Sequence, residues 1–303
     1  MEEGDRPQLK TLHCSDLTIE LDSLLSDGYR LDMIMPADDP REAIVSKSGE
    51  SVRVVLSPGF SRQKPPEGGT QNWIAGRAGM EYRDLIPDRL DGRVIASHIR
   101  ITEGGEVSDY VHYHKIKFQM IFCKAGWIRV VYEDQGPPFV LRAGDCVLQP
   151  PQIRHRVLES SAGAEVIEIS SPAVHETWVE HEIKLPTLDV KRDRDFDGQR
   201  FVLHLADART FDEVCAVAET AISAATQGYA SVRTVRLAAD GVYYREPFGE
   251  FILLYVLSGS IQPNGSNEKL LADDHVVFAH RGETLVITAF EDSEFLEVSL
   301  REI

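Results

Sequence analysis

The chain has 303 residues, of which 43% are hydrophobic and 27% are charged. This length exceeds the usual size of a single domain, and the composition is that of a soluble globular protein, which excludes wholesale disorder. With 49 acidic and 32 basic residues the net charge is −17, which disfavours partners such as nucleic acid or anionic membrane surfaces.

The cysteines and the N-terminus bear on the cellular compartment. The four cysteines, Cys14, Cys123, Cys146 and Cys215, are widely spaced and form no CxxC pair. The first ten residues lack the apolar segment of a signal peptide, and no run of about 18 apolar residues occurs. These features predict a cytoplasmic location and no membrane-spanning segment.

The first 90 residues give the weakest structural signals. "SVRVVLSP", residues 51–58, predicts a strand, whereas the Gly- and Pro-rich residues 59–80 predict a loop. Three arginines near this loop could clamp an anion, although solvated surface residues are the better expectation; they are Arg77, Arg83 and Arg89. We expect residues 1–90 to form an extension that packs on the first β unit.

After residue 90, short β-rich runs such as "RVIASHIRI" and "FVLRAGDCVLQPP" alternate with Gly, Pro and Asp. This spacing predicts an antiparallel sandwich or barrel. The polar residues 180–200 are the natural linker, and the alanine-rich residues 210–226 have apolar residues at helical intervals. Residues 180–227 are therefore expected to separate two β units, at 91–179 and 228–303.

The two β units resemble each other. "LRAGDCVLQPPQIRHRVL" (141–158) shares Leu, Ala, Asp and Val at matched positions with "LLADDHVVFAHRGETLVI" (270–287). "FQMIFCKAGWI" (118–128) and "FILLYVLSGSI" (251–261) share Phe, Gly and Ile in register. These matches predict a tandem duplication of one unit.

Two histidines lie one residue apart in "HYHKIKFQMIFCKAG", residues 112–126. Side chains two apart in a strand share a face, so His112 and His114 would point into one interior, which suits two ligands of one metal ion. Gln119 on the next strand is a third candidate donor, and His155, beyond a Pro–Pro turn, is a fourth. A lone histidine here would more often be a structural side chain; the set predicts a metal site.

The spacing of this set resembles the two motifs of the cupin superfamily, G(X)5HXH(X)3–4E(X)6G and G(X)5PXG(X)2H(X)3N. Beside the histidines, the matching residues are Gly126 in the first motif and Gly144 and Pro150 in the second. The departures are Gln119 in place of Glu, Gln152 in place of Gly, Glu159 in place of Asn, and an opening glycine displaced to Gly105.

The resemblance implies a mainly all-β fold of two tandem cupin-type antiparallel barrels, of jelly-roll topology, with a short helix between them. It implies four metal ligands, which are His112, His114, Gln119 and His155. The alternative for Gln119 is a hydrogen bond without contact to the metal.

The second unit lacks the ligand residues. Counted from the repeat alignment, the positions equivalent to the four ligands hold Arg245, Pro247, Ile252 and Thr284. None of these is a plausible ligand in that setting. His275 and His280 lie out of register and are expected at the surface or in loops. We therefore expect a metal-free second barrel that serves structure, homodimerisation or closure of the first site.

Three imidazoles and one amide are all neutral donors, so the ion would keep its full charge and favour anionic ligands. Fe(II) is the expected ion, with Mn(II), Ni(II) or Zn(II) as alternatives. The resemblance supports a dioxygenase acting on a small chelating anionic substrate. It also supports a non-redox lyase or isomerase, because manganese-dependent cupin hydroxynitrile lyases have a Gln ligand. A non-catalytic ligand-binding module is the third reading.

Two further residues are weaker candidates. His98 in "VIASHIRI" falls on the face opposite the neighbouring isoleucines, and is a candidate acid or base at the barrel mouth or a structural histidine. Cys123 shares the face of Gln119 and is a candidate pocket residue, although a small apolar filler is the commoner role of a buried cysteine.

Overall fold

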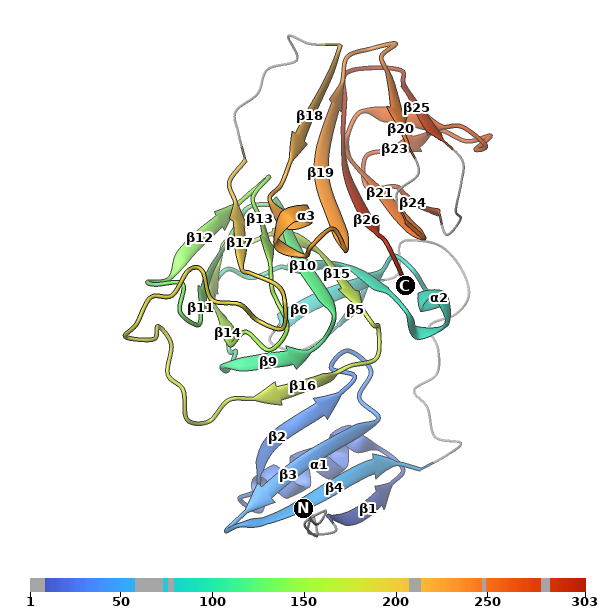
Figure 1. Cartoon of the computed structure of the whole chain (residues 1–303). Coiled ribbons are helices and arrows are strands. Elements are labelled where there is room, and N and C mark those ends of the chain that lie inside the picture. The colour runs from blue at the N-terminus through green and yellow to red at the C-terminus, as the bar shows by residue number, and fades with distance from the viewer. Residues whose placement is uncertain (1–8, 58–72, 76–78, 207–213, 247–248, 279–283) are drawn as a thin grey trace, which may run out of the picture.

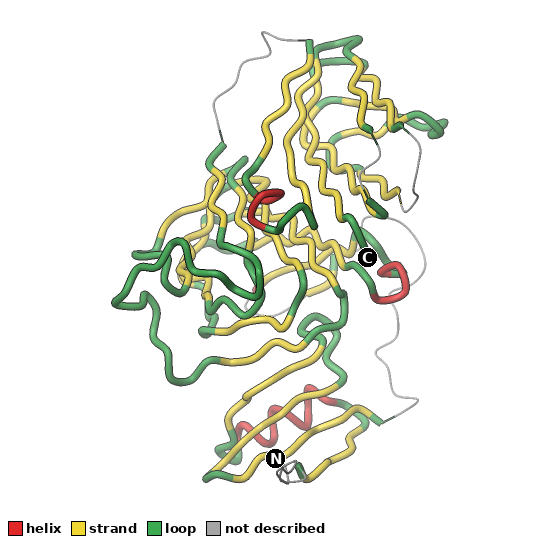
Figure 2. The backbone as a smooth tube through the Cα atoms, in the orientation of Figure 1, coloured by secondary structure: helices red, strands yellow, loops and turns green. Residues whose placement is uncertain are grey.

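The computed structural model describes residues 9–57, 73–75, 79–206, 214–246, 249–278 and 284–303. Figure 1 shows three parts that follow one another along the chain: a small α/β unit, a first β-barrel, and a second β-barrel at the C-terminal end. Strands dominate all three parts, and the helices are short (Figure 2).

The N-terminal unit is a four-stranded sheet with one helix packed on it. Its elements are β1 (Lys10–Cys14), α1 (Leu17–Ser26), β2 (Arg30–Met35), β3 (Glu42–Lys47) and β4 (Glu50–Leu56). The strand order is β1–β4–β3–β2. Asp16 caps α1, since its carboxylate accepts hydrogen bonds from the N–H groups of Thr18 and Ile19. Leu17 and Leu21, one turn apart, are buried in the core that the helix shares with this sheet.

The first barrel consists of two antiparallel sheets. Its elements are β5 (Ile74–Ala75), β6 (Met80–Asp84), α2 (Arg89–Gly92), β7 (Ile95–Ile101), β8 (Gly105–Glu106), β9 (His112–Lys115), β10 (Phe118–Ala125), β11 (Trp127–Tyr132), β12 (Phe139–Arg142), β13 (Cys146–Leu148), β14 (His155–Ser160), β15 (Ala164–Ser171), β16 (Glu176–Val179) and β17 (Val202–His204). One sheet runs β16–β9–β14–β11–β12 and the other β17–β13–β10–β15–β7–β6–β5. Strand β2 pairs with β16, so the N-terminal sheet continues into the first barrel sheet.

The second barrel repeats this plan with fewer strands. Its elements are β18 (Cys215–Glu219), α3 (Ile222–Ala225), β19 (Ala230–Leu237), β20 (Val242–Arg245), β21 (Phe251–Ser258), β22 (Ser260–Pro263), β23 (Leu270–Leu271), β24 (His275–Phe278), β25 (Leu285–Ala289) and β26 (Ser293–Leu300). The order β21–β26–β19 corresponds to β10–β15–β7 of the first barrel. The predicted duplication into two antiparallel barrels is confirmed.

A glycine at the same point of each barrel shows how closely the two repeats agree. Gly126 and Gly259 both have positive φ values, of +67° and +75°. A Cβ atom on Gly126 would lie 2.4 Å from Ser161 Oγ, and one on Gly259 would lie 2.8 Å from Ser293 Cα. The tight turn that follows β10 and β21 therefore requires glycine in both barrels.

The two barrels pack against each other through their β10 and β21 sheets. Phe118 and Met120 of β10 and Phe251 and Leu253 of β21 are fully buried in one shared hydrophobic core. Alternate residues of the same strands, such as Cys123, face the interiors of the barrels. Both faces of these strands are buried, which explains why they appear in the sequence as nearly unbroken apolar runs.

The helix predicted over residues 210–226 is wrong in extent. Residues 207–213 lie outside the described part of the chain, Cys215–Glu219 forms strand β18, and only Ile222–Ala225 is helical. Val217 of β18 lies opposite Val235 of β19. Pairing with a sheet edge overrides the helical preference of alanine. The short helix that the fold prediction included is present as α3.

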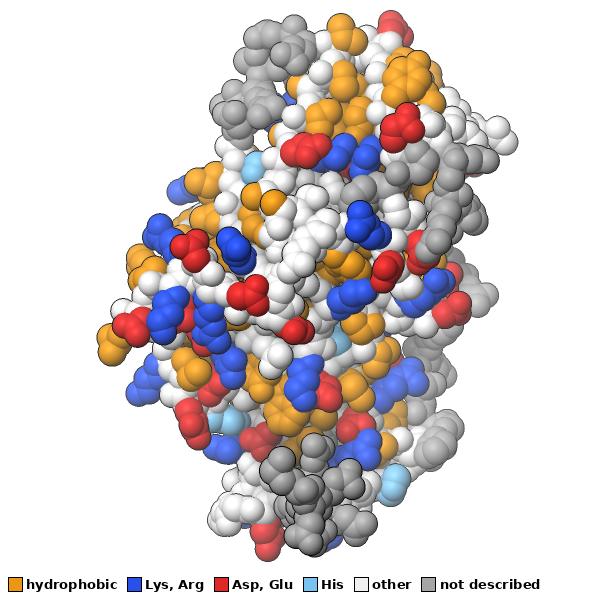
Figure 3. All heavy atoms as spheres, viewed as in Figure 1, with side chains coloured by type: hydrophobic (Ala, Val, Ile, Leu, Met, Phe, Trp, Pro, Cys, Tyr) orange, Lys and Arg blue, Asp and Glu red, His pale blue; other side chains and the backbone are white. Residues whose placement is uncertain are grey.

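The surface carries charges of both signs. On the face drawn in Figure 3, basic and acidic side chains lie side by side across the middle of the molecule. None of the helices in the described ranges has the length and apolar character needed to cross a bilayer.

Candidate metal centre

Three histidines meet inside the first barrel. His112 and His114 lie on β9, and His155, at the start of β14, pairs directly with His112. One ring nitrogen from each of the three lies within 4.8 Å of the other two. Their ring centroids are 4.3 to 5.2 Å apart. The sequence spacing predicted this convergence, because residues two apart on β9 share a face.

Each ring is fixed by a hydrogen bond at Nδ1. The Nδ1–H groups of His112 and His155 donate to the carbonyl oxygens of Tyr110 (2.8 Å) and Ile153 (3.0 Å), since a carbonyl can only accept. His114 Nδ1 lies 2.9 Å from Thr177 Oγ1. The Nε2 lone pairs of His112 and His155 are thereby left for a ligand. Such outer hydrogen bonds select the tautomer of metal-binding histidines.

The two most buried imidazoles are neutral at pH 7. Burial lowers the pKa of His114 and of His155 well below its usual value, and the neighbouring His112 lowers both further. Neutral imidazole is the form that binds a metal ion. Three imidazoles with ring nitrogens within 4.8 Å of one another therefore fit a divalent cation.

Gln119 lies on β10 and is buried, as expected for a metal ligand inside the barrel. Its Nε2 donates a hydrogen bond to Glu168 Oε1 on β15, over 2.7 Å. This bond fixes the orientation of the amide and leaves its oxygen, the only atom of the group that can bind a metal, on the other side. Burial raises the pKa of Glu168. Sequence analysis missed this carboxylate.

A fourth imidazole lies beside the three. The ring of His175, just before β16, is 5.3 Å from that of His114, and its Nδ1–H donates to the carbonyl of Pro172 (2.9 Å). Burial lowers the pKa of His175. Sequence analysis also missed His175, because it matches neither motif and reaches the site only through the pairing of β16 with β9.

The departure from the second motif at Gln152 has a structural consequence. Gln152 has a φ of +61°, the left-handed conformation that favours glycine, and its N–H donates to the carbonyl of His114 (3.0 Å). The turn before His155 therefore keeps the backbone of the motif without its glycine.

His98 is not at this site. It lies on the outer face of β7, opposite the isoleucines as predicted, where the two barrels meet. Its Nδ1 accepts a hydrogen bond from Arg83 Nη2 (3.0 Å), because a guanidinium can only donate, so its Nε2–H donates to Glu165 Oε2 (2.8 Å). Tyr255 Oη of the second barrel lies 3.1 Å from the same Nδ1. We therefore regard His98 as a structural histidine of the barrel interface.

The charged groups around His98 form one network across the interface. Lys124 Nζ lies 2.5 Å from Glu165 Oε2 and 2.9 Å from Asp273 Oδ1 of the second barrel. Arg83 Nη2 also donates to the carbonyl of Asp273 (3.0 Å). Burial lowers the pKa of His98 to about 4; the hydrogen bond to Glu165 opposes this shift, and the charges of Arg83 and Lys124 add to it.

Acidification is expected to destabilise the protein partly through His98. The unfolded chain binds a proton at His98 as the pH falls below 6.5, whereas the folded protein does so only near pH 4. Stability should therefore fall by up to about 3 kcal/mol between these pH values and level off below pH 4. The test compares urea denaturation of the wild type and of His98→Gln at pH 7 and pH 4. Equal pH dependence in the two proteins would contradict this expectation.

The other candidates lie away from the three histidines or outside the described residues. Cys123 is fully buried among apolar side chains of the barrel, and burial raises its pKa to about 12, as expected for apolar filler. Arg77 lies outside the described residues, Arg83 joins the interface network, and Arg89 pairs with Asp38 and Asp84.

The second barrel differs from two expectations. Arg245 pairs with Leu285, in the way that His112 pairs with His155 in the first barrel. The residue equivalent to His155 is therefore Leu285 and not Thr284, and the ungapped sequence alignment was wrong by one residue here. His275 is not a free surface residue; it begins β24 and its Nε2–H donates to the carbonyl of Leu85 in the first barrel (2.6 Å). Pro247 and His280 lie outside the described residues.

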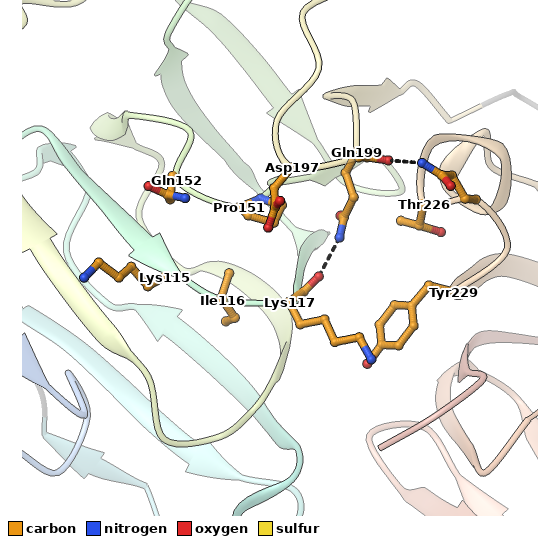
Figure 4. A pocket seen from close by; sticks show the side chains of 11 residues that line it. Lys115, Ile116, Lys117, Pro151, Gln152, Asp197, Gln199, Thr226 and Tyr229 are labelled. Atoms are coloured by element: carbon orange, nitrogen blue, oxygen red, sulfur yellow. Dashed lines mark hydrogen bonds between the residues drawn. The ribbon is translucent and has the colours of Figure 1, made fainter. Parts of the chain in front are cut away.

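A cavity of about 590 Å³ lies next to the β9–β10 turn and does not include the three histidines. Its walls come from that turn, the β13–β14 turn and the segments around Gln199 and Tyr229. Figure 4 shows the Gln199 amide reaching the carbonyl of Lys117, a hydrogen bond of 2.6 Å, and Lys117 extending over the Tyr229 ring. Through these contacts the linker and the second barrel pack against the β9–β10 turn, which follows His114 in the sequence.

Comparison with known proteins identifies the fold. No sequence-family model matches the chain, and no curated protein matches it. Among the solved structures that match, three have TM-scores of 0.51 to 0.55. A variant of salicylate 1,2-dioxygenase from Pseudoaminobacter salicylatoxidans has a TM-score of 0.51 at 14% identity, over 69% of this chain and 70% of that one. Oxalate decarboxylase from Lactobacillus farciminis, in a formate complex, has a TM-score of 0.53 at 15% identity, over 75% and 82%.

The third structure is procruciferin, an 11S globulin from Brassica napus, with a TM-score of 0.55 at 10% identity over 77% and 84% of the two chains. The chain thus has the two-barrel fold of the bicupins. The matched proteins include two enzymes and a globulin, so fold alone does not define the activity, and the function has to be argued from the site.

Proposed function

We propose that this chain is a metal-dependent cupin enzyme, and more specifically an Fe(II) dioxygenase that acts on a small, chelating, anionic organic substrate. The observation that carries the proposal is the convergence of three imidazoles, from His112, His114 and His155, with no carboxylate among the three. A divalent ion whose direct ligands are all neutral carries an excess of positive charge within its ligand set and favours an anionic substrate as a further ligand.

When bound, Fe(II) would supply Lewis acidity toward the substrate and the electrons for reaction with O₂. The chain's own residues orient and enclose the reactants. Hydrogen bonds at Nδ1 fix the histidine rings, and the buried Tyr132 ring stacks on His155 with centroids 5.6 Å apart. Gln149 Nε2 donates to Tyr132 Oη (2.9 Å), which fixes that ring in turn. Apolar residues such as Ile128 and Val130 fill the barrel interior and exclude water.

Two comparisons support this reading without defining a substrate. A structure of salicylate 1,2-dioxygenase holds gentisate, a small aromatic acid, and a structural neighbour from Bacillus subtilis, an oxalate decarboxylase, contains Mn(II) centres. The first supports a small-molecule substrate for the present chain, and the second supports a divalent metal.

A non-redox lyase or isomerase with Mn(II), Ni(II) or Zn(II) is the second candidate. It is favoured by a group that can move protons beside the site: His175, whose ring lies 5.3 Å from that of His114. Its pKa is lowered, so it is uncharged at neutral pH and able to accept a proton.

The test is metal analysis of protein purified without chelators, followed by O₂ consumption with 1,3-diketones, catechols and hydroxy acids. Bound iron with substrate-dependent O₂ uptake supports the dioxygenase. Turnover without O₂ uptake supports the lyase or isomerase. Absence of turnover in the metal-loaded protein across the panel would favour a ligand-binding module. Well-folded protein that binds no metal would refute both metal-dependent enzymes.

Replacement of Gln119 by glutamate is expected to weaken binding of anionic substrates about 10-fold, because it removes one unit of positive charge from the site. It would also place a second carboxylate 2.7 Å from Glu168 in place of the present donor, so the metal-free variant should melt at a lower temperature. Substrate KM and the melting temperature of metal-free protein are the measurements, with Gln119→Leu as the uncharged control. An unchanged KM would place Gln119 outside the metal site.

A further inference from the structure

Each barrel has a glutamate at the same place, half-buried in the first barrel and fully buried in the second. Glu168 on β15 lies opposite Ile121, and Glu297 on β26 lies opposite Leu254, which are equivalent positions of the repeat. Two residues further on, Ser170 and Ser299 each lie 3.4 Å from Oε1 of their glutamate. The segments "EIS" and "EVS" therefore occupy the same position in the two barrels.

In the second barrel this glutamate is neutralised by arginine. Glu297 is fully buried, and Arg245 Nε donates to its Oε1 over 2.8 Å. Arg233 Nε lies 3.6 Å from the same oxygen, and Tyr243 donates to Oε2 over 3.0 Å. A buried carboxylate needs such partners, because desolvation of an unpaired charge is costly.

The arginine comes from the position of a proposed metal ligand. Arg245 precedes Gly259 by the same number of residues as His112 precedes Gly126. Arg245 pairs with the first residue of β25, as His112 pairs with His155 at the start of β14. The position that holds the imidazole of His112 in the first barrel thus holds the guanidinium of Arg245 in the second barrel.

Glu168 has no such cation. Its contacts are the amide of Gln119 at 2.7 Å and Ser170, and no lysine, arginine or histidine forms an ion pair with it among the described residues. Both hydrogen bonds go to Oε1, so Oε2 accepts none from the described part of the chain. The first barrel therefore has a half-buried carboxylate without a cationic partner among the described residues and a set of three cation-binding nitrogens.

We infer that Glu168 is an outer carboxylate of the metal centre: without binding the ion itself, it offsets part of the charge of the ion that the three histidines bind, as Arg245 offsets the charge of Glu297 in the second barrel. Glu168 is a positioning residue that acts through Gln119, because its hydrogen bond to Nε2 fixes the orientation of the amide. This inference rests on the proposed metal site. It explains how a site with four neutral donors is compensated without the glutamate of the first cupin motif.

The test uses Mn(II) alone as the probe and compares Glu168→Gln with Glu297→Gln, its equivalent in the second barrel. Glu168→Gln should lower Mn(II) affinity by about 10- to 100-fold, measured by calorimetry, and should not lower the melting temperature of the metal-free protein. Glu297→Gln should lower the melting temperature with and without Mn(II), since two arginines lose their buried partner, and should leave the affinity unchanged.

Three further proteins make the result specific. Glu168→Asp keeps the charge and should restore part of the affinity, and it serves as the probe if Glu168→Gln does not fold. In a Gln119→Leu background, Glu168→Gln should reduce the Mn(II) affinity much less, because the hydrogen bond between the two residues is already absent. His155→Ala tests the metal site itself.

Unchanged Mn(II) affinity in Glu168→Gln, together with loss of binding in His155→Ala, would overturn the role of Glu168 and leave the metal site intact. A wild-type protein that binds no Mn(II), Fe(II) or Co(II) would overturn both. A Co(II) absorption spectrum that changes in Glu168→Gln would support an effect on the ligand set, whereas a purely structural role would leave the spectrum as in the wild type.

Discussion

Protein with His155 replaced by alanine is expected to lose divalent-metal binding by more than about 100-fold, a larger effect than loss of an outer partner such as Glu168. His155 closes the site from β14, opposite His112 of β9, and its Nδ1–H is already held by the carbonyl of Ile153. With only the two imidazoles of β9 left, an ion would lose one of its three nitrogen ligands.

The measurement is Mn(II) or Fe(II) affinity by calorimetry, with circular dichroism to show that the variant is folded. His13→Ala is the matched control, because His13 is an exposed histidine on β1 of the N-terminal unit. It should bind metal like the wild type. Retained affinity in His155→Ala would mean that the three histidines do not form the site.

Replacement of Phe118 by alanine is expected to cost about 3–5 kcal/mol of the free energy of unfolding, the usual range for a fully buried phenylalanine. Phe118 lies in the hydrophobic core that the two barrels share, beside Phe251 of the second barrel's equivalent strand. The loss should therefore destabilise both barrels together.

Urea denaturation followed by circular dichroism and by tryptophan fluorescence is the measurement. The control is Phe290→Ala, since this ring is 39% exposed and its loss should cost less than about 1 kcal/mol. A cost below about 1 kcal/mol for Phe118→Ala would contradict a shared core. Separate transitions by the two probes would show that the barrels unfold independently.

The sequence predicted the parts of the site that depend on local periodicity. His112 and His114 share a face because they are two apart on one strand, and His155 follows a turn whose glycine and proline are recognisable. The alternation of side chains along a strand also predicted which face of β7 carries His98 and which face of β10 carries Cys123, and both predictions agree with the structure.

The parts that depend on which strands pair could not be predicted in the same way. Glu168 reaches Gln119 across 49 residues of sequence, through the pairing of β10 with β15. His175 reaches His114 through β16, a strand that carries no motif. The role of His98 depended on what lies beyond its strand, namely the second barrel, and alternation within one strand contains no such information.

The alanine-rich residues 210–226 illustrate the same limit. Their composition favours a helix locally, but Cys215–Glu219 gains backbone hydrogen bonds and a packing partner as an edge strand of the second barrel. The glutamate repeat, by contrast, was readable: "AEVIEIS" and "SEFLEVS" match at Glu165 and Glu294, Glu168 and Glu297, and Ser170 and Ser299. Only the structure shows that Glu297 is fully buried and Glu168 half-buried.

The most direct test of the metal centre is the stoichiometry and ligand type of bound metal in the full chain. Protein loaded with Mn(II) or Fe(II) and freed of excess metal should contain one ion per chain, with magnetic-resonance couplings to imidazole nitrogens that disappear in His155→Ala. Folded protein that retains no ion, or retains one without couplings to imidazole nitrogen, would contradict a metal centre built on His112, His114 and His155.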